Sequence, residues 1–366
     1  GKMAPLVWGG ARLGRGTPMQ RVAACKGCNP SARGFSRPTH RRPSRRSGAG
    51  LVAAGGLSSL ASVVESQQFD RPMLEELFEV AREMERITED GSECKILAGK
   101  VMGTLFYEPS TRTRLSFETA MCRLGGKVVS TENAREFSSV AKGETLEDTI
   151  RTLEQYVDVV VLRHFQAGSA RIAADAASVP LISAGDGPGQ HPTQALLDIY
   201  TIQKEIGRVD DTKVALVGDL ANGRTARSLA YILSKFRNVK LYFVAPDVAR
   251  INEDIKEHLT ECGCEWEEVD NLQSVASEVD VLYQTRIQKE RYGDRPEDYE
   301  KAQGKFIVDE DLMRLMKQDA VVMHPLPRVG EITPQVDADP RAAYFRQAKN
   351  GLYIRMALLA TLLKGK

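Results

Sequence analysis

Residues 157–206, VDVVVLRHFQAGSARIAADAASVPLISAGDGPGQHPTQALLDIYTIQKEI, decide the fold class of this chain. After Asp158 the segment has the apolar run Val159–Leu162, which is typical of a strand buried on both faces of a parallel sheet. Short apolar strands then alternate with helical patterns, and this alternation predicts an open α/β sheet. The expected elements are a strand over 157–162, a helix over 170–177, a strand over 180–183, a glycine-rich loop over 185–189 and a helix over 193–206.

The same alternation extends toward both ends of the chain. The last segment, 342–363, is apolar almost all round and predicts a buried helix that packs back onto an earlier domain. We therefore expect two doubly wound parallel-sheet α/β domains, hinged near residues 190–210, with a C-terminal helix returning to the first domain. The further expected strands are 98–107, 213–217, 239–244, 279–284 and 320–323, and the further expected helices are 72–88, one opening within 108–114, 145–156, 225–236, 252–262 and 309–318.

Length and composition limit the class of protein. A chain of 366 residues has room for two ordinary domains with sizeable cores. Six cysteines are too few for a disulfide framework, and no apolar run approaches the roughly 18–20 residues that span a bilayer. Cys25 and Cys28 form a lone CxxC motif without the second pair that a zinc site needs. We expect a soluble protein that binds no membrane and no metal.

Charge is unevenly distributed along the chain, although its net value is only +1. Residues 1–64 contain 11 Lys and Arg, nine of them Arg, and no Asp or Glu precedes Glu65. This Arg-rich, Ser-containing composition is typical of an organelle transit peptide. The alternatives are an unstructured basic tail and a nucleic-acid-binding arm. Aromatic residues do not alternate with the basic ones as base stacking in a nucleic-acid-binding arm would require. The rest of the chain has 39 basic against 49 acidic residues, which argues against nucleic-acid binding there.

The first candidate site is Ser110-Thr-Arg-Thr-Arg114, between an expected strand and an expected helix. A helix N-terminus offers unpaired backbone N–H groups and the positive end of the helix dipole, which together bind phosphate. Hydroxyl groups and the forked guanidinium of Arg112 add donors for phosphate oxygens. The alternative is an ordinary Ser/Thr N-cap followed by surface arginines.

Four further polar clusters follow expected strands, at the sheet edge where such folds bind ligands. Each His or Arg taken alone is more often structural, but their shared placement favours a site. The side chains are mostly donors, and no GxSxG, HExxH or paired-carboxylate motif accompanies them. Such a set suits an anionic substrate whose carbonyl is polarised and attacked by a second substrate while phosphate leaves. The clusters are Arg163–Gln166, His191–Gln194, Arg286–Gln288 and His324–Arg328.

The segment VGDLANGRT, 217–225, has the composition of a dinucleotide-binding turn but not its spacing. Because the GxGxxG pattern is absent, we expect no nicotinamide or flavin cofactor. Arg224, near the start of an expected helix, is better explained as another anchor for a carboxylate or phosphate group.

Taken together, these motifs resemble the aspartate carbamoyltransferase family, from about residue 66 to the C-terminus, and in detail its plant and algal members. The related ornithine enzymes have His-Cys-Leu-Pro where this chain has His324-Pro-Leu-Pro, and a Ser-Met-Gly loop where it has Arg286-Ile-Gln288. A cationic Arg pairs with the second carboxylate of aspartate and repels the ammonium group of ornithine. The motifs are FYEPSTRTRLSFE (106–118), KGETLEDT (142–149), GQHPTQALLD (189–198), VGDLANGRT (217–225), QTRIQKER (284–291) and HPLPR (324–328).

The resemblance implies a role for each matching residue. Thr113, Arg163 and His191 would be catalytic donors to the carbamoyl oxygen, while Gln194 and nearby backbone carbonyls would accept from the carbamoyl NH₂ group. The implied carbamoyl phosphate site is Ser110, Thr111, Arg112, Thr113, Arg163, His191, Gln194, Pro325, Leu326 and Pro327. The implied aspartate site is Lys142, Arg224, Arg286 and Gln288, and Ser138 and Lys142 would come from a mobile loop of the neighbouring subunit.

The resemblance also implies an activity and an assembly. Enzymes of this family transfer the carbamoyl group of carbamoyl phosphate to L-aspartate in pyrimidine synthesis, without a cofactor, as homotrimers with shared sites. Residues 65–192 plus 341–366 would bind carbamoyl phosphate, residues 193–340 would bind aspartate, and the transit segment 1–64 would direct the protein to the chloroplast stroma. The alternatives are a transcarbamoylase for another amine such as ornithine, or a non-catalytic phosphometabolite-binding paralogue.

Plant enzymes of this family are inhibited by the pathway product UMP, and the resemblance extends that expectation to this chain. The UMP phosphate would occupy the carbamoyl phosphate site, and the uracil carbonyl and N–H would face His191 and Gln194. Phe137, beside the mobile loop, would pack on the nucleotide, although an ordinary loop anchor is an equal alternative. The expected UMP-binding residues are Arg112, Thr113, Phe137, Arg163, His191 and Gln194.

Overall fold

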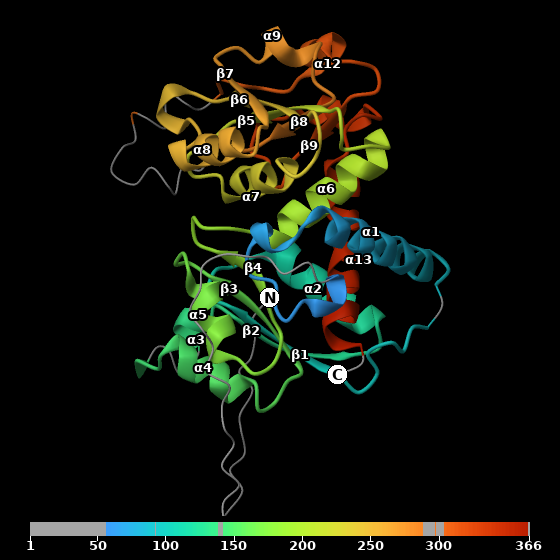
Figure 1. Ribbon diagram of the computed structural model, residues 1–366, viewed down its shortest axis with the longest axis vertical. Coiled ribbons are helices and arrows are strands. Elements are labelled where there is room, and N and C mark those ends of the chain that lie inside the picture. Colours follow the sequence, from blue (N-terminus) through green and yellow to red (C-terminus); the bar gives the residue numbers. More distant parts are fainter. Residues whose placement is uncertain (1–55, 92, 138–141, 288–296, 298–303, 365–366) are drawn as a thin grey trace, which may run out of the picture. The chain divides into compact units, whose positions relative to one another are not determined.

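The computed structural model describes residues 56–91, 93–137, 142–287, 297 and 304–364. All of them fall within one compact unit, Val52–Lys366. This unit contains two separate parallel sheets, each with helices beside it (Figure 1).

The first sheet has four parallel strands in the order β2-β1-β3-β4. Parallel neighbours cannot be joined by tight hairpins, so helices make the crossover connections. Its strands are β1 (Val101–Phe106), β2 (Lys127–Glu132), β3 (Val159–His164) and β4 (Leu181–Asp186), and the accompanying elements are η1 (Leu57–Ser59), η2 (Ser66–Gln68), α1 (Arg71–Glu89), α2 (Thr111–Arg123), α3 (Ala134–Phe137), α4 (Leu146–Leu153) and α5 (Ser169–Ala176).

The second sheet has five parallel strands in the order β7-β6-β5-β8-β9. The chain reaches it through the long helix α6 (Pro192–Ile206). Its strands are β5 (Lys213–Val217), β6 (Lys240–Val244), β7 (Glu265–Val269), β8 (Val281–Gln284) and β9 (Val321–Met323), and its helical elements are α7 (Arg224–Leu233), η4 (Asp247–Ala249), α8 (Glu253–Glu261), α9 (Gln273–Ala276), α12 (Glu310–Leu315) and η5 (Pro334–Ala338).

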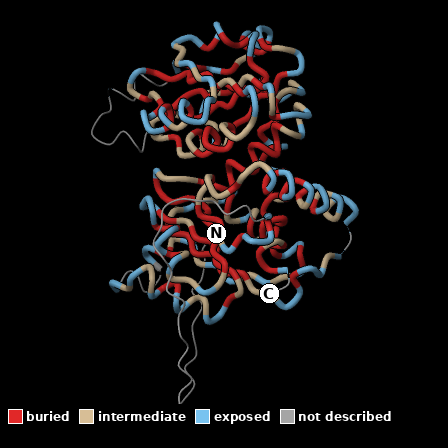
Figure 2. Tube along the Cα trace, in the orientation of Figure 1, coloured by how far each residue is buried: buried red, intermediate tan, exposed pale blue. Residues whose placement is uncertain are grey.

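Both faces of each sheet are covered, as the continuous apolar runs of the central strands predict. Successive side chains point to opposite faces of a strand, and successive residues here join different cores. Val159 and Val160 of β3 belong to two distinct apolar clusters, and so do Val214 and Ala215 of β5. The central strands are accordingly buried along their length (Figure 2). The predicted class, two doubly wound parallel-sheet α/β domains, is confirmed.

The C-terminal helix α13 (Tyr344–Leu363) returns to the first sheet and packs against α1, α2 and α6 (red in Figure 1). Its side chains are buried without a break from Tyr353 to Ala360, which explains the apolar pattern all round. A Cβ atom added at Gly351 would lie 3.0 Å from Leu197 Cδ2 of α6, so glycine allows the two helices to approach this closely. Among the residues described, no helix is long and apolar enough to cross a bilayer.

The structure corrects the expected boundary of the N-terminal segment at residue 64. Residues 57–64 are packed into the first domain, with Leu57 and Val63 almost fully buried. The Val63 amide donates to Leu181 O, and Val63 O accepts from the Ser183 amide, both at 2.7 Å, which extends the sheet beside β4. The apolar pair Val63-Val64 and the buried Leu57 are therefore part of the fold, although no acidic residue precedes Glu65.

The two strands that the sequence did not predict, β2 and β7, each lie at one edge of a sheet, whereas the strands at the opposite edges, β4 and β9, are apolar and were predicted. The sequences of β2 and β7, KVVSTE and EWEEV, mix charged and apolar residues. Outer strands face solvent on more than one side, and charged residues there discourage pairing with other chains. The apolar pattern of β2 and β7 is therefore too weak to identify from sequence alone.

Candidate active site

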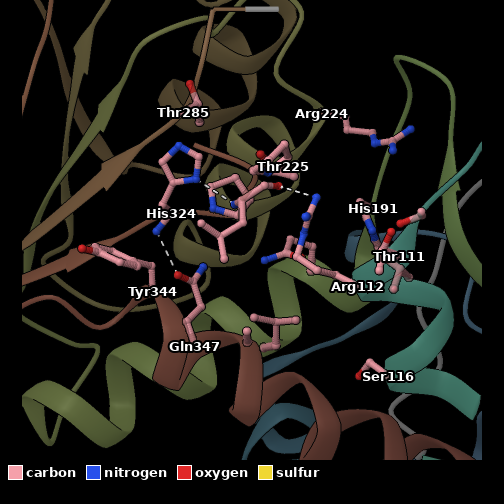
Figure 3. Close-up of a pocket in the computed structure, with 18 of the residues that line it drawn as sticks. Thr111, Arg112, Ser116, His191, Arg224, Thr225, Thr285, His324, Tyr344 and Gln347 are labelled. Carbon is pink, nitrogen blue, oxygen red and sulfur yellow. Dashed lines mark hydrogen bonds between the residues drawn. The ribbon is translucent and has the colours of Figure 1, made fainter. Parts of the chain in front are cut away.

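A cavity of about 780 Å³ lies where polar residues follow the carboxyl ends of strands from both sheets. This is the position at which open α/β sheets bind ligands. Figure 3 shows side chains from α2, α6, α13 and the loop after β9 gathered around it. The sequence-predicted residues that line this cavity are Ser110, Thr111, Arg112, Thr113, Arg163, His191, Gln194, Arg224, Arg286, Pro325, Leu326 and Pro327.

The N-terminus of α2 forms one wall of the cavity. Ser110 is its N-cap, with φ −157° and ψ 95°, but its side chain makes no capping hydrogen bond. The hydroxyl group and the amides of the first helical turn are therefore available to a ligand. Arg112 donates from Nη2 to Leu326 O at 3.0 Å. Burial, followed by repulsion from Arg286, lowers the pKa of Arg112, which indicates a strongly positive cavity.

Two further arginines flank one carboxylate in this wall. Arg163 Nη2 lies 3.4 Å from Glu108 Oε2, and Arg224 Nη1 lies 3.6 Å from the same oxygen. Arg163 is near the end of β3 in the first sheet and Arg224 begins α7, a helix of the second domain, so Glu108 contacts residues of both domains. Because one carboxylate faces two guanidinium groups, this wall carries a net positive charge.

Gly185 makes room for these two arginines. Its φ is +112°, a conformation that side chains with a Cβ atom rarely adopt. A Cβ atom there would lie 3.0 Å from Arg224 Cζ and 3.3 Å from Arg163 Nη1. Gly185, in the predicted glycine-rich segment, therefore allows both guanidinium groups to lie close to the backbone.

His191 immediately precedes α6 and is only 4% exposed. Its amide donates to Ser228 Oγ at 3.0 Å, and its Nδ1 is buried without a hydrogen-bond partner among the described residues. Burial lowers the pKa of His191 well below its usual value, and the positive charges of Arg224, Arg163 and Arg355 lower it further. The imidazole is therefore neutral near pH 7, with one N–H donor and one lone pair.

A fully buried carboxylate, Asp198, lies one helical turn after Gln194. Its Oδ1 accepts from Gln194 Nε2 at 2.9 Å and from Gln347 Nε2 at 2.6 Å, and its Oδ2 accepts from Tyr283 OH at 2.7 Å. Gln347 Oε1 in turn accepts from the His324 amide at 2.9 Å (Figure 3). Burial raises the pKa of Asp198 to about 7, while these donors oppose that rise.

The loop after β9 is held by its own histidine. His324 Nδ1 accepts from the Leu326 amide at 2.7 Å, and its Nε2 bonds to Glu331 Oε1 at 2.7 Å. This pair of contacts fixes a tautomer with the proton on Nε2, so His324 supports the loop rather than offering a donor to the cavity. Leu326 has a φ of 53°, and the Leu326–Pro327 peptide is cis.

Helix α13 contributes a residue that sequence reasoning missed. Arg355 lines the cavity, is fully buried, and donates from Nη1 to Ser116 Oγ at 3.0 Å. Burial lowers the pKa of Arg355 to about 10. Its guanidinium also lies 5.2 Å from the ring centre of Phe117, a cation–π distance. The other lining residues that were not predicted include Glu108, Ser116, Thr225, Thr285, Tyr344 and Gln347.

The charge of the lining is strongly one-sided. Its only acidic residue among those described is Glu108, whereas the arginines in it are Arg112, Arg163, Arg224, Arg286 and Arg355. Such a cavity attracts ligands that carry several negative charges. In the described part of the chain, no group of three or more His, Cys, Asp or Glu side chains is arranged to hold a metal ion.

Some predicted site residues lie elsewhere. Lys142 is exposed and does not line this cavity. Phe137 is the last residue of α3. Ser138 and Gln288 lie outside the described residues.

The sequence matches two family patterns in succession. Residues 62–204 match the carbamoyl-P binding domain of aspartate/ornithine carbamoyltransferases, and residues 210–362 match their Asp/Orn binding domain. The chain belongs to the aspartate/ornithine carbamoyltransferase family. Both matches together cover most of the chain, so membership applies to the cavity as well as to the fold.

Relatives within this carbamoyltransferase family come from plants and from more distant organisms. The chain is 66% identical over 306 residues to a chloroplastic aspartate carbamoyltransferase of Arabidopsis thaliana, covering 84% of this chain and 78% of the relative. It is 61% identical over 360 residues to that of Oryza sativa subsp. japonica, covering 95% and 98%. A structure of Trypanosoma cruzi aspartate transcarbamoylase, in complex with carbamoyl phosphate and aspartate, matches with 42% identity and a TM-score of 0.80, covering 84% and 99%.

Proposed function

We propose that this protein transfers the carbamoyl group from carbamoyl phosphate to the amine of L-aspartate, giving N-carbamoyl-L-aspartate and phosphate. The observation that carries the proposal is the cavity in which five arginines and the N-terminus of α2 converge around a single carboxylate. The two substrates together carry a phosphate and two carboxylates, which this excess of guanidinium groups matches. The reaction is an early step of pyrimidine synthesis.

The phosphate of carbamoyl phosphate binds at the N-terminus of α2. The free hydroxyl of Ser110 and the first-turn amides of Thr111, Arg112 and Thr113 provide donors, and the helix dipole favours the dianion. The Arg112 guanidinium, now bonded to Leu326 O, lies beside this site and adds a forked donor.

The carbonyl oxygen of the carbamoyl group faces Thr113, Arg163 and His191. Because Nδ1 of His191 is enclosed, the neutral tautomer with its proton on Nε2 presents a donor to the cavity. These groups are fixed before substrate arrives, so they stabilise the oxyanion of the tetrahedral intermediate without reorganisation. Gln194 and the backbone carbonyl of Leu326 accept from the carbamoyl NH₂ group.

Aspartate binds through its two carboxylates, to Arg224, Arg286 and Gln288. Its neutral amine forms a bond to the carbamoyl carbon, and collapse of the intermediate breaks the bond from that carbon to the phosphate oxygen. The departing phosphate accepts the proton released by the amine. Positioning and electrostatics therefore account for catalysis, and no cofactor is required.

The exposed Lys142, together with Ser138, completes the site of a neighbouring subunit. This assignment is supported by the position of Lys142 outside the cavity of its own chain. It requires a homotrimer with shared active sites, in which each site combines residues of two subunits.

The domains divide the substrates between them. The first domain, residues 57–192 with the C-terminal segment 341–366 that contains α13, binds carbamoyl phosphate, and residues 193–340 bind aspartate. The Arg-rich segment that precedes the packed Leu57 is a transit peptide, and the protein acts in the plastid stroma. The chloroplastic names of the plant relatives support this location.

UMP inhibits the enzyme at the same cavity. Its phosphate dianion occupies the α2 N-terminus, with Arg112, Thr113 and Arg163, and its uracil faces His191 and Gln194. Phe137, at the end of α3, packs on the nucleotide. Inhibition should be competitive with carbamoyl phosphate. Phe137→Ala should weaken the binding of UMP more than the binding of carbamoyl phosphate. Inhibition that persists undiminished at saturating carbamoyl phosphate would require a separate site.

The reaction is tested by following ¹³C-labelled carbamoyl phosphate by NMR. Purified protein with L-aspartate should give the resonance of N-carbamoyl-L-aspartate, in EDTA as well as in untreated buffer. Absence of this product, or a requirement for added metal, would contradict the proposal. Glu108→Gln, which keeps the side-chain size but removes the carboxylate shared by Arg163 and Arg224, should lower the rate and serves as a site-specific control.

A further inference from the structure

Asp198, the last residue of the motif HPTQALLD, takes no direct part in the reaction above. It is fully buried in α6, yet it accepts three side-chain hydrogen bonds. Burying a carboxylate costs free energy unless its oxygens accept hydrogen bonds. The three donors therefore stabilise Asp198 at this buried position. Two of them, Gln194 and Gln347, line the cavity, whereas Asp198 itself does not.

The contact with Gln194 determines which end of its amide faces the substrate. Asp198 Oδ1 accepts from Nε2 of Gln194 at 2.9 Å, so the NH₂ end of this amide meets the carboxyl group. The amide carbonyl, Oε1, then points away from Asp198. No hydrogen bond within the described part of the chain uses this oxygen, and Gln194 lines the cavity.

We propose that Asp198 is a positioning residue that selects the carbamoyl group by holding the Gln194 carbonyl oxygen toward the substrate NH₂. The inference rests on the proposed function, because it concerns how that substrate is recognised. A methyl group in place of NH₂ leaves the fixed oxygen without a donor, and a buried unpaired acceptor is costly. The site therefore discriminates carbamoyl phosphate from acetyl phosphate, which has the same carbonyl and phosphate.

The same carboxylate also links the two substrate sites. Tyr283, which donates to Oδ2, lies in β8 three residues before Arg286. Gln347, which donates to Oδ1, fixes the backbone of His324 at the start of the loop that carries Leu326. Asp198 thus fixes the Gln194 carbonyl oxygen, the acceptor for the carbamoyl NH₂ group, relative to the loop after β8 and the loop after β9.

Two substitutions separate the hydrogen-bonding role from a merely structural one. Asp198→Leu has a similar size but removes both acceptor oxygens. Asp198→Asn keeps one oxygen for Gln194 and Gln347, while its new NH₂ group can donate to the Tyr283 oxygen. Asp280 provides a matched control because it is also a buried carboxylate with two donors, Lys213 N and Lys317 Nζ, but neither of these donors lines the cavity.

The measurements are the dissociation constants of carbamoyl phosphate, acetyl phosphate and inorganic phosphate, by calorimetry. The wild-type protein should bind carbamoyl phosphate more tightly than acetyl phosphate. Asp198→Leu should raise the dissociation constant of carbamoyl phosphate about tenfold and change those of acetyl phosphate and inorganic phosphate less than about threefold. The ratio that matters is the dissociation constant of acetyl phosphate divided by that of carbamoyl phosphate. Asp198→Asn should retain the wild-type ratio, and Asp280→Leu should lower the melting temperature without changing that ratio.

Several outcomes would overturn the inference. They are equal affinity of the wild type for the two acyl phosphates, an unchanged ratio in Asp198→Leu, or an equal loss for all three ligands. If Asp198→Leu does not fold, Asp198→Ala, which places a good helix former at this position, gives the same comparison. Formation of carbamoyl-aspartate by the wild type tests the proposed function separately, so failure of one is distinguishable from failure of the other.

Discussion

His191 illustrates how burial prepares a single residue for its role. A partly solvated histidine titrates near pH 6.5, but burial and three nearby arginines lower the pKa of His191 well below that value. A neutral imidazole donates one hydrogen bond without adding another positive charge to an arginine-rich cavity. It therefore contributes a fixed donor rather than a proton.

Removal of this donor should affect turnover far more than folding. Loss of one preorganised oxyanion donor lowers the rate by about 10²–10³, so we expect His191→Ala to reduce kcat by that factor. The circular dichroism spectrum should remain that of the wild type. An unchanged kcat would show that His191 only supports the fold, through its amide bond to Ser228.

The protonation state of His191 is directly measurable by NMR. Because its pKa is lowered, the imidazole should remain neutral from pH 8 down through pH 6.5, and its ring nitrogen shifts should not change over that range. The resonance is assigned by comparison with His191→Ala. Titration with a midpoint at or above pH 6.5 would contradict the electrostatic account of the cavity.

Sequence alone predicted the residues whose role is local. Ser110 to Thr113 could be identified because a strand followed by a hydroxyl-rich helix start has a direct physical meaning. Arg355 and Asp198 could not, because each lies within a helix and, apart from the contact of Asp198 with Gln194 in the same helix, reaches its partners through tertiary packing. Their burial is visible only once α13 is placed against α2 and α6.

Among the elements, the apolar strands were predictable, including the outer strands β4 and β9, whereas the outer strands of mixed composition, β2 and β7, were not. β3 and β5 are buried on both faces and read as continuous apolar runs, whereas β2 and β7 are outer strands with mixed composition. The return of α13 was predictable from its apolar surface. The contribution of α13 to the cavity was not.

The packing of α13 against α6 predicts that alanine at position 351 destabilises the protein, the opposite of its usual effect in a helix. Alanine normally stabilises a helix relative to glycine, by roughly 0.5–1 kcal/mol. At Gly351, the added Cβ would instead meet Leu197 and the buried Arg355 guanidinium. Gly351→Ala should therefore lower the melting temperature by about 2–4 °C and weaken phosphate binding. A higher melting temperature with unchanged phosphate affinity would contradict this account of the helix contact.

At the scale of the whole molecule, the shared site is tested by mixing two inactive variants. Arg112→Ala lacks a phosphate ligand of its own cavity, and Lys142→Ala lacks the residue supplied to a neighbour. In mixed trimers, some sites combine an intact cavity with an intact Lys142, so activity should return. Persistent inactivity in trimers shown by mass spectrometry to be mixed would place Lys142 and Arg112 in the same subunit's site.

The choice of acceptor tests the central claim most directly, because it depends on the complete cavity. The measurement is kcat/KM for L-aspartate and for L-ornithine, at saturating carbamoyl phosphate. Arg286 and Arg224 attract the carboxylates of aspartate and repel the side-chain ammonium of ornithine. We predict efficient turnover of aspartate and no detectable turnover of ornithine. Equal or faster turnover of ornithine would contradict the proposed function.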